Sequence, residues 1–335
     1  MKEDEGRFFD RLSNGSGANG EAEKGRGAVR KRLILVAAGV LIMSIVVQSY
    51  LAVRTAERAV TEKTENYLID KAQSVAEKLD RKAASFFRYM EIPARSPIIK
   101  NAAVSYAKRA DALYELVSFD GEIREIALCD MSGNCFVNGG RTFSAAAAEW
   151  FRIAADGKGF VSEPISVPGA DTRRIVFALP VYGGGQTVTG VLCAFVSHGF
   201  FSEEIKDITV GHTGYCAAFG LTGDTVAHPD GRFTEKAANM LEEAAQNSAL
   251  SSFKDLMTTA LESDQVGVGR YTFMGTPYLA AYAPMNSTAW TVVVKAPEQE
   301  FMGAVNVLRR AVIMTGVTVA LVSLLVIIRA VRRFV

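Results

Sequence analysis

Residues 33–53 read LILVAAGVLIMSIVVQSYLAV, a run of apolar and small polar residues without a charged side chain. A second such run, residues 311–328, reads AVIMTGVTVALVSLLVII. Each is close to the roughly 20 residues that a helix needs to cross the hydrocarbon core of a bilayer. A charge at the centre of such a helix would cost about 2.5–3.5 kcal/mol, so its absence favours transmembrane helices over residues 33–53 and 311–329. The residues between them are expected to form a large folded insert on one side of a membrane.

Basic side chains gather on the terminal side of both runs. They are Arg26, Arg30, Lys31 and Arg32 before the first run, and Arg329, Arg332 and Arg333 after the second. Because cytoplasmic loops carry an excess of Lys and Arg, this pattern places both termini in the cytoplasm of a bacterial cell and the insert outside its inner membrane. Arg54 and the Arg309-Arg310 pair lie on the other side and weaken the assignment without reversing it.

The first run is also longer than the about 7–15 residues of a signal-peptide core, so it is interpreted as a retained anchor. Residues 1–32 are polar and rich in Gly, and we expect them to form a disordered cytoplasmic tail. Residues 330–335 would form a second, short cytoplasmic tail.

Charge and motifs exclude several function classes. The 37 Lys and Arg residues nearly balance the 36 Asp and Glu residues, so no strong field favours a nucleic acid as partner. His198, His212 and His228 lack the spacing of metal ligands, and no metal is expected. The sequence shows no nucleophile elbow, phosphate loop or supported pair of carboxylates, so we expect neither an enzyme nor a cofactor.

Cys129 and Cys135 flank the turn sequence Asp130-Met131-Ser132-Gly133-Asn134. They could form a disulfide across a hairpin in an oxidising periplasm. They could equally be small buried strand residues, as Cys193 and Cys216 could be. The sequence leaves both interpretations open.

The periodicity of the insert predicts an α+β fold with two modules and antiparallel sheets. Residues 54–97 are rich in Ala, Glu, Lys and Leu with one apolar face, which predicts a long spine helix that continues from the membrane. A membrane-distal module over residues 98–205 would contain a helix (98–117), strands (123–129, 135–138, 160–167, 174–181 and 188–196) and a second helix (144–156). A membrane-proximal module over residues 206–300 would contain a hairpin (214–221 and 224–227), a helix (234–259) and strands (267–273, 276–284 and 290–296). Residues 301–310 would form a connecting helix.

Three stretches carry a resemblance to a known family. They are Trp150-Phe151 with Gly157-Lys158-Gly159 and Ser162-Glu163-Pro164; Gly211-His212-Thr213-Gly214-Tyr215 with Gly223 and His228-Pro229-Asp230; and Tyr278, Tyr282-Ala283-Pro284-Met285 and Trp290-Thr291-Val292-Val293-Val294. In this order, over residues 55–301, they resemble a double Cache domain, the extracytoplasmic sensor of many bacterial chemoreceptors and sensor kinases. The resemblance implies two PAS-like modules, a small-molecule ligand in the membrane-distal module, and a homodimer formed through the spine helix.

The resemblance also implies candidate ligand-binding residues. Trp150 and Phe151 would line the pocket, although they could equally pack a helix on the sheet. Arg173 and Arg174 could offer a fork for a carboxylate, or form a solvated strand end. Phe195 could face the pocket or the other side of its strand.

Amino-acid-binding members of the family carry an Arg, a Tyr and an Asp where this chain has Ala148, Ile165 and Phe195. Without that Arg and Asp, a zwitterion has no obvious anchor. We therefore expect that the protein does not sense free amino acids through that motif.

These features together indicate a transmembrane sensor that binds a small extracytoplasmic ligand and relays its presence across the membrane in signal transduction or chemotaxis. Because few residues follow the second run, the expectation is either a chain truncated before its output domain or one that signals through a cytoplasmic or membrane partner. The alternative is a membrane-tethered exported hydrolase or a binding module without a signalling role.

Overall fold

The computed structural model describes residues 4–101, 103–117, 121–183, 186–236 and 238–333. The chain divides into two units, one of residues Met1–Glu62 with Met302–Val335, and one of residues Lys63–Phe301. The helix α1 (Asp4–Ala94) contributes to both units. The other elements of the second unit lie between α1 and α10 (Gly303–Arg333) in the sequence.

The first unit holds two stretches that are long and apolar enough to cross a membrane. One lies in α1 after Arg32, and the other is Val305–Arg329 in α10. Their apolar side chains are exposed in the chain by itself, as at Leu33 (68%), Met314 (68%) and Leu325 (66%). Side chains of this kind in a soluble protein would be buried, so their exposure fits contact with lipid. Both stretches coincide with the predicted spans.

The ends of these helices differ from the sequence prediction. The helix α1 begins at Asp4, so the expected disordered tail over residues 1–32 is helical from that residue on. A helix that is already nucleated extends at low cost, because each further residue adds a hydrogen bond. The spine helix is the continuation of α1 and ends at Ala94, one residue after Pro93. The expected connecting helix is split between α9 (Glu298–Phe301) and the first turns of α10.

The first module of the second unit is built on a six-stranded antiparallel sheet. Its strand order is β3-β2-β1-β6-β5-β4. The strands are β1 (Ile123–Cys129), β2 (Asn134–Val137), β3 (Thr142–Ser144), β4 (Phe160–Val161), β5 (Arg174–Tyr182) and β6 (Val188–Ser197). Its helices are α2 (Pro97–Lys100), α3 (Tyr106–Val117), α4 (Glu149–Ala155) and α5 (Ser202–Ile205). A disulfide joins Cys129 and Cys135 across the β1–β2 hairpin, which settles the alternative that the sequence left open.

The second module contains a second antiparallel sheet with the order β10-β11-β12-β8-β7, and β9 pairs with β8. Its strands are β7 (Thr209–Val210), β8 (Gly214–Phe219), β9 (Thr225–Ala227), β10 (Gly267–Phe273), β11 (Thr276–Pro284) and β12 (Thr291–Pro297). The helices α6 (Gly231–Glu235), α7 (Met240–Gln246), α8 (Ser251–Glu262) and a 3-10 turn (Ser248–Leu250) stand where the sequence predicts one helix over residues 234–259. The breaks follow from capping, because the side chains of Asn239 and Asn247 each accept backbone N–H groups of the segment that follows.

One strand is shorter than predicted. The sequence predicts a strand over residues 160–167, but the ladder of β4 ends at Val161. The hydroxyl of Ser162 accepts the N–H of Val176, and Pro164 has no N–H to offer, so regular pairing stops here. A bridge between Ile165 and Arg174 continues the contact with β5.

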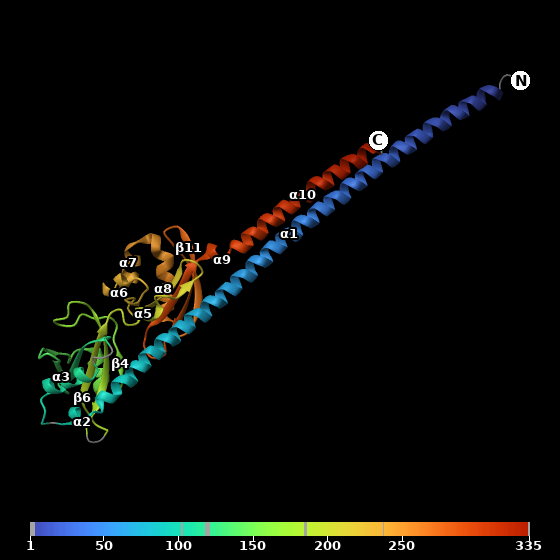
Figure 1. Ribbon diagram of the computed structural model, residues 1–335. Coiled ribbons are helices and arrows are strands. Elements are labelled where there is room, and N and C mark those ends of the chain that lie inside the picture. The colour runs from blue at the N-terminus through green and yellow to red at the C-terminus, as the bar shows by residue number, and fades with distance from the viewer. Residues whose placement is uncertain (1–3, 102, 118–120, 184–185, 237, 334–335) are drawn as a thin grey trace. The chain divides into compact units, whose positions relative to one another are not determined.

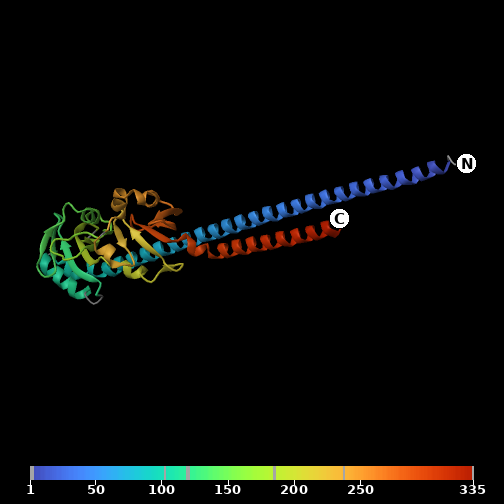
Figure 2. The same cartoon turned by 90° about the horizontal axis from the view of Figure 1, so that it is seen from above.

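Each sheet is covered on one face by α1 and on the other by helices of its own module. The α1 side chains Leu68, Ala72, Leu79, Ala83 and Phe86 belong to one buried cluster with residues of both sheets. In Figures 1 and 2 the cyan stretch of α1 passes beside both modules. The opposite face of the first sheet packs on α4, and that of the second sheet packs on α7 and α8. We call the former the α4-side face and the latter the α8-side face.

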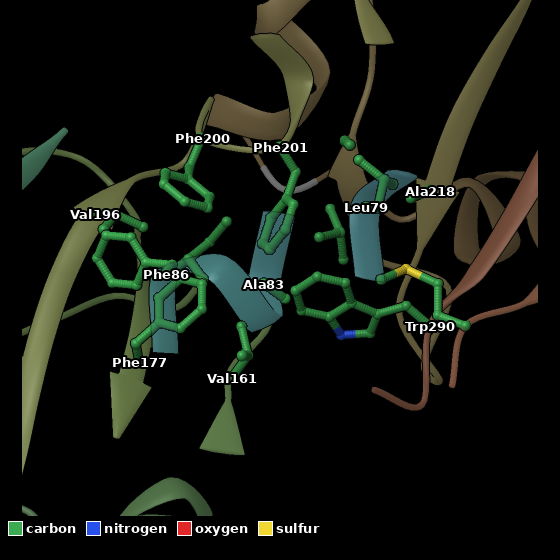
Figure 3. Packing of buried hydrophobic residues seen from close by; sticks show 14 of the residues in the cluster. Leu79, Ala83, Phe86, Val161, Phe177, Val196, Phe200, Phe201, Ala218 and Trp290 are labelled. Carbon is green, nitrogen blue, oxygen red and sulfur yellow. The ribbon is translucent and has the colours of Figure 1, made fainter. Parts of the chain in front are cut away.

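Aromatic rings join the two modules, as Figure 3 shows. Phe86 of α1 lies 4.3 Å from Phe177 of β5 between ring centroids. Phe200 and Phe201, between β6 and α5, lie 4.9 Å apart, and Phe201 lies 5.1 Å from Trp290 at the start of β12. All five residues are buried. We call this group the aromatic seam, because it runs without interruption from the first sheet to the second.

Candidate functional site

Three of the five predicted site residues come together on the α4-side face. Trp150 and Phe151 of α4 are 6% and 5% exposed, and Phe195 of β6 is fully buried in the same apolar cluster. The rings of Trp150 and Phe151 stand edge to face at 6.3 Å, and Phe195 meets Phe143 in the same way at 6.2 Å. The alternation of β6 therefore turns Phe195 toward the side on which the resemblance places the ligand.

The same face carries a half-buried ion pair that the sequence did not reveal. Glu125 of β1 is the register partner of Phe195, and Val176 of β5 is the partner of Phe195 on its other side. Arg141, just before β3, donates from Nη2 to Glu125 Oε2. The other terminal nitrogen of Arg141, Nη1, is buried and has no hydrogen-bond acceptor among the described residues. A buried N–H without an acceptor is uncommon and calls for a partner.

Arg174 presents a second unpaired nitrogen. It is two residues before Val176 on β5, so its side chain starts on the α4-side face. Its Nη1 donates to the Thr172 hydroxyl, while its Nε is buried without an acceptor among the described residues. Arg173 is engaged differently, because its Nη1 donates to the Pro164 carbonyl at 3.1 Å. The two neighbouring arginines that the sequence treats alike therefore have different environments.

The loop between β4 and β5 lies against Arg141 and leads to Arg174, the first residue of β5. A Cβ built on Gly169 of this loop would lie 3.0 Å from Cδ and Nη1 of Arg141. Gly169 also has a φ of +77°, which favours glycine over residues with side chains. The loop can therefore lie directly against Arg141 at Gly169. Arg174 follows Gly169 by five residues, at the start of β5. Arg141 is paired with the carboxylate of Glu125, whereas no ion pair is found for Arg174 among the described residues.

A polar contact links this loop to the second module. The carboxylate of Glu163 accepts the N–H of Leu221 at 2.9 Å and the hydroxyl of Thr222 at 3.3 Å, both in the β8–β9 hairpin. Burial raises the pKa of Glu163, although the Leu221 N–H opposes the effect. A Cβ added at Gly220 would lie 2.1 Å from the Glu163 carboxyl group, so a larger residue at this position would displace the Glu163 side chain.

The opposite face of the first sheet offers a wide groove of about 900 Å³. It is lined by Phe87 and Glu91 of α1, by Arg95 just after α1, and by Leu179 and Tyr182 of β5. Its charged groups satisfy each other, because Arg95 pairs with Glu91 at 3.1 Å. The α4-side face has two buried guanidinium nitrogens without an acceptor among the described residues. It is therefore the better candidate for a ligand site, although the groove is wide.

The positions that depart from the amino-acid-binding pattern keep an apolar character. Ala148 is the residue before α4 and offers no side-chain hydrogen bond. Ile165 packs at the edge of the α4-side cluster, beside the bridge to Arg174. Sequence reasoning missed Glu125 and Arg141. The available signal was Glu125, a charged residue that alternation places on the same face of β1 as Ala127 and Cys129.

Comparison with known proteins now assigns the fold. The model of a family described as Cache domain, in its double form dCache_1, matches residues 52–305. The chain belongs to the Cache domain family. No curated protein matches the chain.

Solved structures share this Cache fold. The ligand-binding domain of the Pseudomonas fluorescens chemoreceptor CtaA in complex with L-isoleucine has a TM-score of 0.58 at 17% identity, and the match covers 75% of this chain and 99% of that domain. The ligand-binding domain of the Pseudomonas aeruginosa PAO1 amino acid chemoreceptor PctB with L-Arg has a TM-score of 0.55 at 16% identity, covering 71% and 97%. The extracellular domain of the histidine-kinase candidate rpHK1S-Z16 has a TM-score of 0.55 at 16% identity, covering 72% and 98%. At these identities the likeness establishes the fold, and the resemblance seen in the sequence is confirmed.

Proposed function

We propose that this Cache protein is a transmembrane receptor whose first module binds a small extracytoplasmic anion, such as a carboxylate, on the α4-side face. The observation that carries the proposal is the pair of buried guanidinium nitrogens, Arg141 Nη1 and Arg174 Nε, that have no acceptor among the described residues. A carboxylate supplies two acceptor oxygens and a negative charge, and charge-assisted hydrogen bonds of this type are about twice as strong as neutral ones. Trp150, Phe151 and Phe195 would contact the apolar part of the ligand.

The ligand would be an anion rather than a zwitterion. Phe195 offers no acceptor to an ammonium group, and the carboxylate of Glu125, its register partner, is already paired with Arg141. The related chemoreceptor domains are described in complex with amino acids. We therefore expect this receptor to differ from those domains in the charge of its ligand. The ligand would still bind in the first module.

Relay to the membrane would use contacts that already join the modules. A ligand changes a conformational equilibrium only as far as its affinity differs between the two states. The loop between β4 and β5 carries both Arg174 and the Glu163 contact with the second module, so ligand binding would act on that contact directly. The insert would face outward and both termini would lie in the cytoplasm. A homodimer formed through the spine helix, with a cytoplasmic or membrane partner, would complete the signal.

The proposal is tested with the full chain in detergent, by calorimetry with pairs of compounds that differ only in an amino group. One such pair is L-isoleucine and 3-methylpentanoate. We expect the carboxylate to bind at least 10-fold more tightly than the amino acid, and Arg174→Met to weaken that binding by at least 10-fold. Arg173→Met is the matched control and should change the affinity by less than 3-fold. Tighter binding of the amino acid, or equal effects of the two arginine variants, would refute the proposal.

A further inference from the structure

The second module contains a half-buried cation that the first-module site does not use. Lys295 interrupts the apolar strand β12, two residues after Val293, which packs in the α8-side cluster. Its ammonium group is surrounded by aromatic rings, with Nζ 4.6 Å from the ring centroid of Tyr215. The centroids of Phe273, Tyr278 and Tyr271 follow at 5.6, 5.8 and 5.9 Å. Four rings within about 6 Å make a cation–π cage for this ammonium.

Lys295 has no counter-ion in its surroundings. Among the described residues, no carboxylate oxygen lies within 4.0 Å of its Nζ. Burial lowers the pKa of Lys295 to about 8, so the group still carries its charge at pH 7. The rings stabilise this charge in part, but they do not neutralise it. An unpaired buried charge is costly, and proteins keep one where it has a use.

A cavity of about 220 Å³ lies next to this ammonium. At ~30 Å³ for each water molecule, it has room for about seven water-sized groups. Lys295, Tyr215 and Tyr271 line it, together with Phe219, Met257 and Val293. The cavity therefore combines a cationic group with an apolar and aromatic wall, as small-molecule sites do.

The hydroxyl of Tyr271 is a second unsatisfied group at this cavity. Tyr271 is 3% exposed, and its hydroxyl has no hydrogen-bond partner among the described residues. Burial raises the pKa of Tyr271 and raises that of Tyr215 to about 12, so both phenols keep their protons and can donate. The rings of Tyr271 and Tyr278 stack with their centroids 5.4 Å apart, and the Tyr215 ring lies 4.6 Å from the same ammonium group of Lys295.

His228 adds a further donor. Its Nδ1 accepts the N–H of Asp230 at 3.0 Å, and burial lowers its pKa, so the neutral ring carries its proton on Nε2. His228 also lines the cavity. The one acidic residue among those that line it, Glu243 of α7, is exposed to solvent. The donors thus outnumber the acceptors in the enclosed part of the site.

We propose that the second module holds a separate ligand site for a small monocarboxylate with an apolar or aromatic body, whose carboxylate contacts Lys295 and Tyr271. The charge of Lys295 repels a ligand cation, and its own ammonium already occupies the aromatic cage. One unpaired cation matches one negative charge, and the volume limits the rest of the molecule to a few carbon atoms or one ring. This site does not depend on the anion site proposed for the first module.

The test uses the full chain in detergent and three probes of nearly equal shape: benzoate, benzamide and benzylamine. Calorimetry and the shift in melting temperature report binding. We expect benzoate to bind, benzamide to bind at least 10-fold more weakly, and benzylamine to give no measurable binding. Propanoate and 2-methylpropanoate extend the series to smaller bodies. Failure of all three carboxylates to bind the unaltered chain would overturn the proposal.

Variants assign the binding to one module. Lys295→Met should abolish benzoate binding, and Tyr271→Phe, which removes only the hydroxyl, should weaken it by about 5-fold or more. The matched control is Arg270→Met, which alters the neighbouring residue of β10 that pairs with Glu65 of α1 instead. Arg174→Met removes a residue of the anion site proposed for the first module, and the benzoate binding that depends on Lys295 should persist in this variant. Binding that survives both Lys295→Met and Tyr271→Phe but is lost in Arg174→Met belongs to the first module and would overturn this proposal without affecting the first one.

Discussion

At the scale of single residues, Lys295 predicts an unusual response of stability to pH. Its pKa is lowered from 10.5 to about 8 in the folded chain, so between these values the unfolded chain binds more protons than the folded one. Stability from this group therefore rises as the pH increases from about 8 to about 10.5. The cost of holding the charge at neutral pH is about 3 kcal/mol, of which cation–π attraction offsets roughly 0.5–2 kcal/mol.

The measurement is the melting temperature of the full chain between pH 7 and pH 9.5, compared with that of Lys295→Met. We expect the difference between the two proteins to shift in favour of the unaltered chain as the pH rises. The comparison cancels the other titrating groups around Lys295, which are His228, Tyr215, Tyr271, Tyr278 and Glu243. Lys254→Met, which removes an exposed lysine of α8, is the control and should show a constant difference. A constant difference for Lys295→Met as well would contradict the assignment.

Single residues also show which features the sequence alone could not predict. Lys295 stands out in the sequence as a charge within Val292-Val293-Val294-Lys295-Ala296. The environment of its ammonium group depends on Tyr215 and Tyr271, which come from two other strands. Only the register of β12 with β8 and the covering of that face by α8 bring these rings around the ammonium. Similarly, Arg141 lies in a turn that has no periodic pattern, and only the folded loop shows that it reaches Glu125.

At the scale of elements, regular structure was the most predictable part. The strand-forming runs 123–129, 267–273 and 276–284, each bounded by turn residues, predict β1, β10 and β11 with their observed bounds. The two-residue strands β4 and β7 are too short to carry such a pattern. The sequence predicts a helix from residue 144, whereas α4 begins at Glu149. Ala148, which precedes α4, offers no capping side chain to mark its start.

The aromatic seam is the element-scale feature with the largest predicted effect on stability. Trp290 is 3% exposed and contacts Phe201, so Trp290→Ala would leave a cavity between the two modules. Truncation of a buried Trp to Ala costs about 3–5 kcal/mol. We expect a large fall in melting temperature, measured by circular dichroism of the full chain in detergent.

Two comparisons sharpen this prediction. Leu221→Ala, at a position that is 62% exposed, should shift the melting temperature little. Phe201→Ala should act like Trp290→Ala, and the double variant should lose less than the sum of the two, because the two rings share one contact. Strict additivity would show that the seam does not couple the modules.

At the scale of the whole molecule, the proposed orientation in the membrane has a direct test. Thr259→Cys introduces an exposed thiol in α8, and Arg329→Cys introduces one at the last residue of the second candidate span. In intact bacterial cells with a permeable outer membrane, we expect an impermeant maleimide to label the first variant only. Lysis should make the second accessible. The cysteines already present add little background, because Cys193 and Cys216 are buried and Cys129 and Cys135 are joined. Labelling of Arg329→Cys in intact cells would contradict the proposed orientation.

The way α1 serves both modules limits how such a receptor can change over generations. Asp80 accepts the backbone N–H groups of Asn286 and Ser287 in the second module, while Phe86, six residues later, packs on Phe177 in the first. Six residues of helix span about 9 Å, so one short stretch has to match two sheets at once. Recombination between residues 205 and 206 could replace one module by that of a relative. The two modules would then share an α1 helix whose sequence matches only one of them. The inheritable unit is therefore the whole of residues 63–301, and new ligand preferences should spread by point substitution in the loops rather than by shuffling of modules.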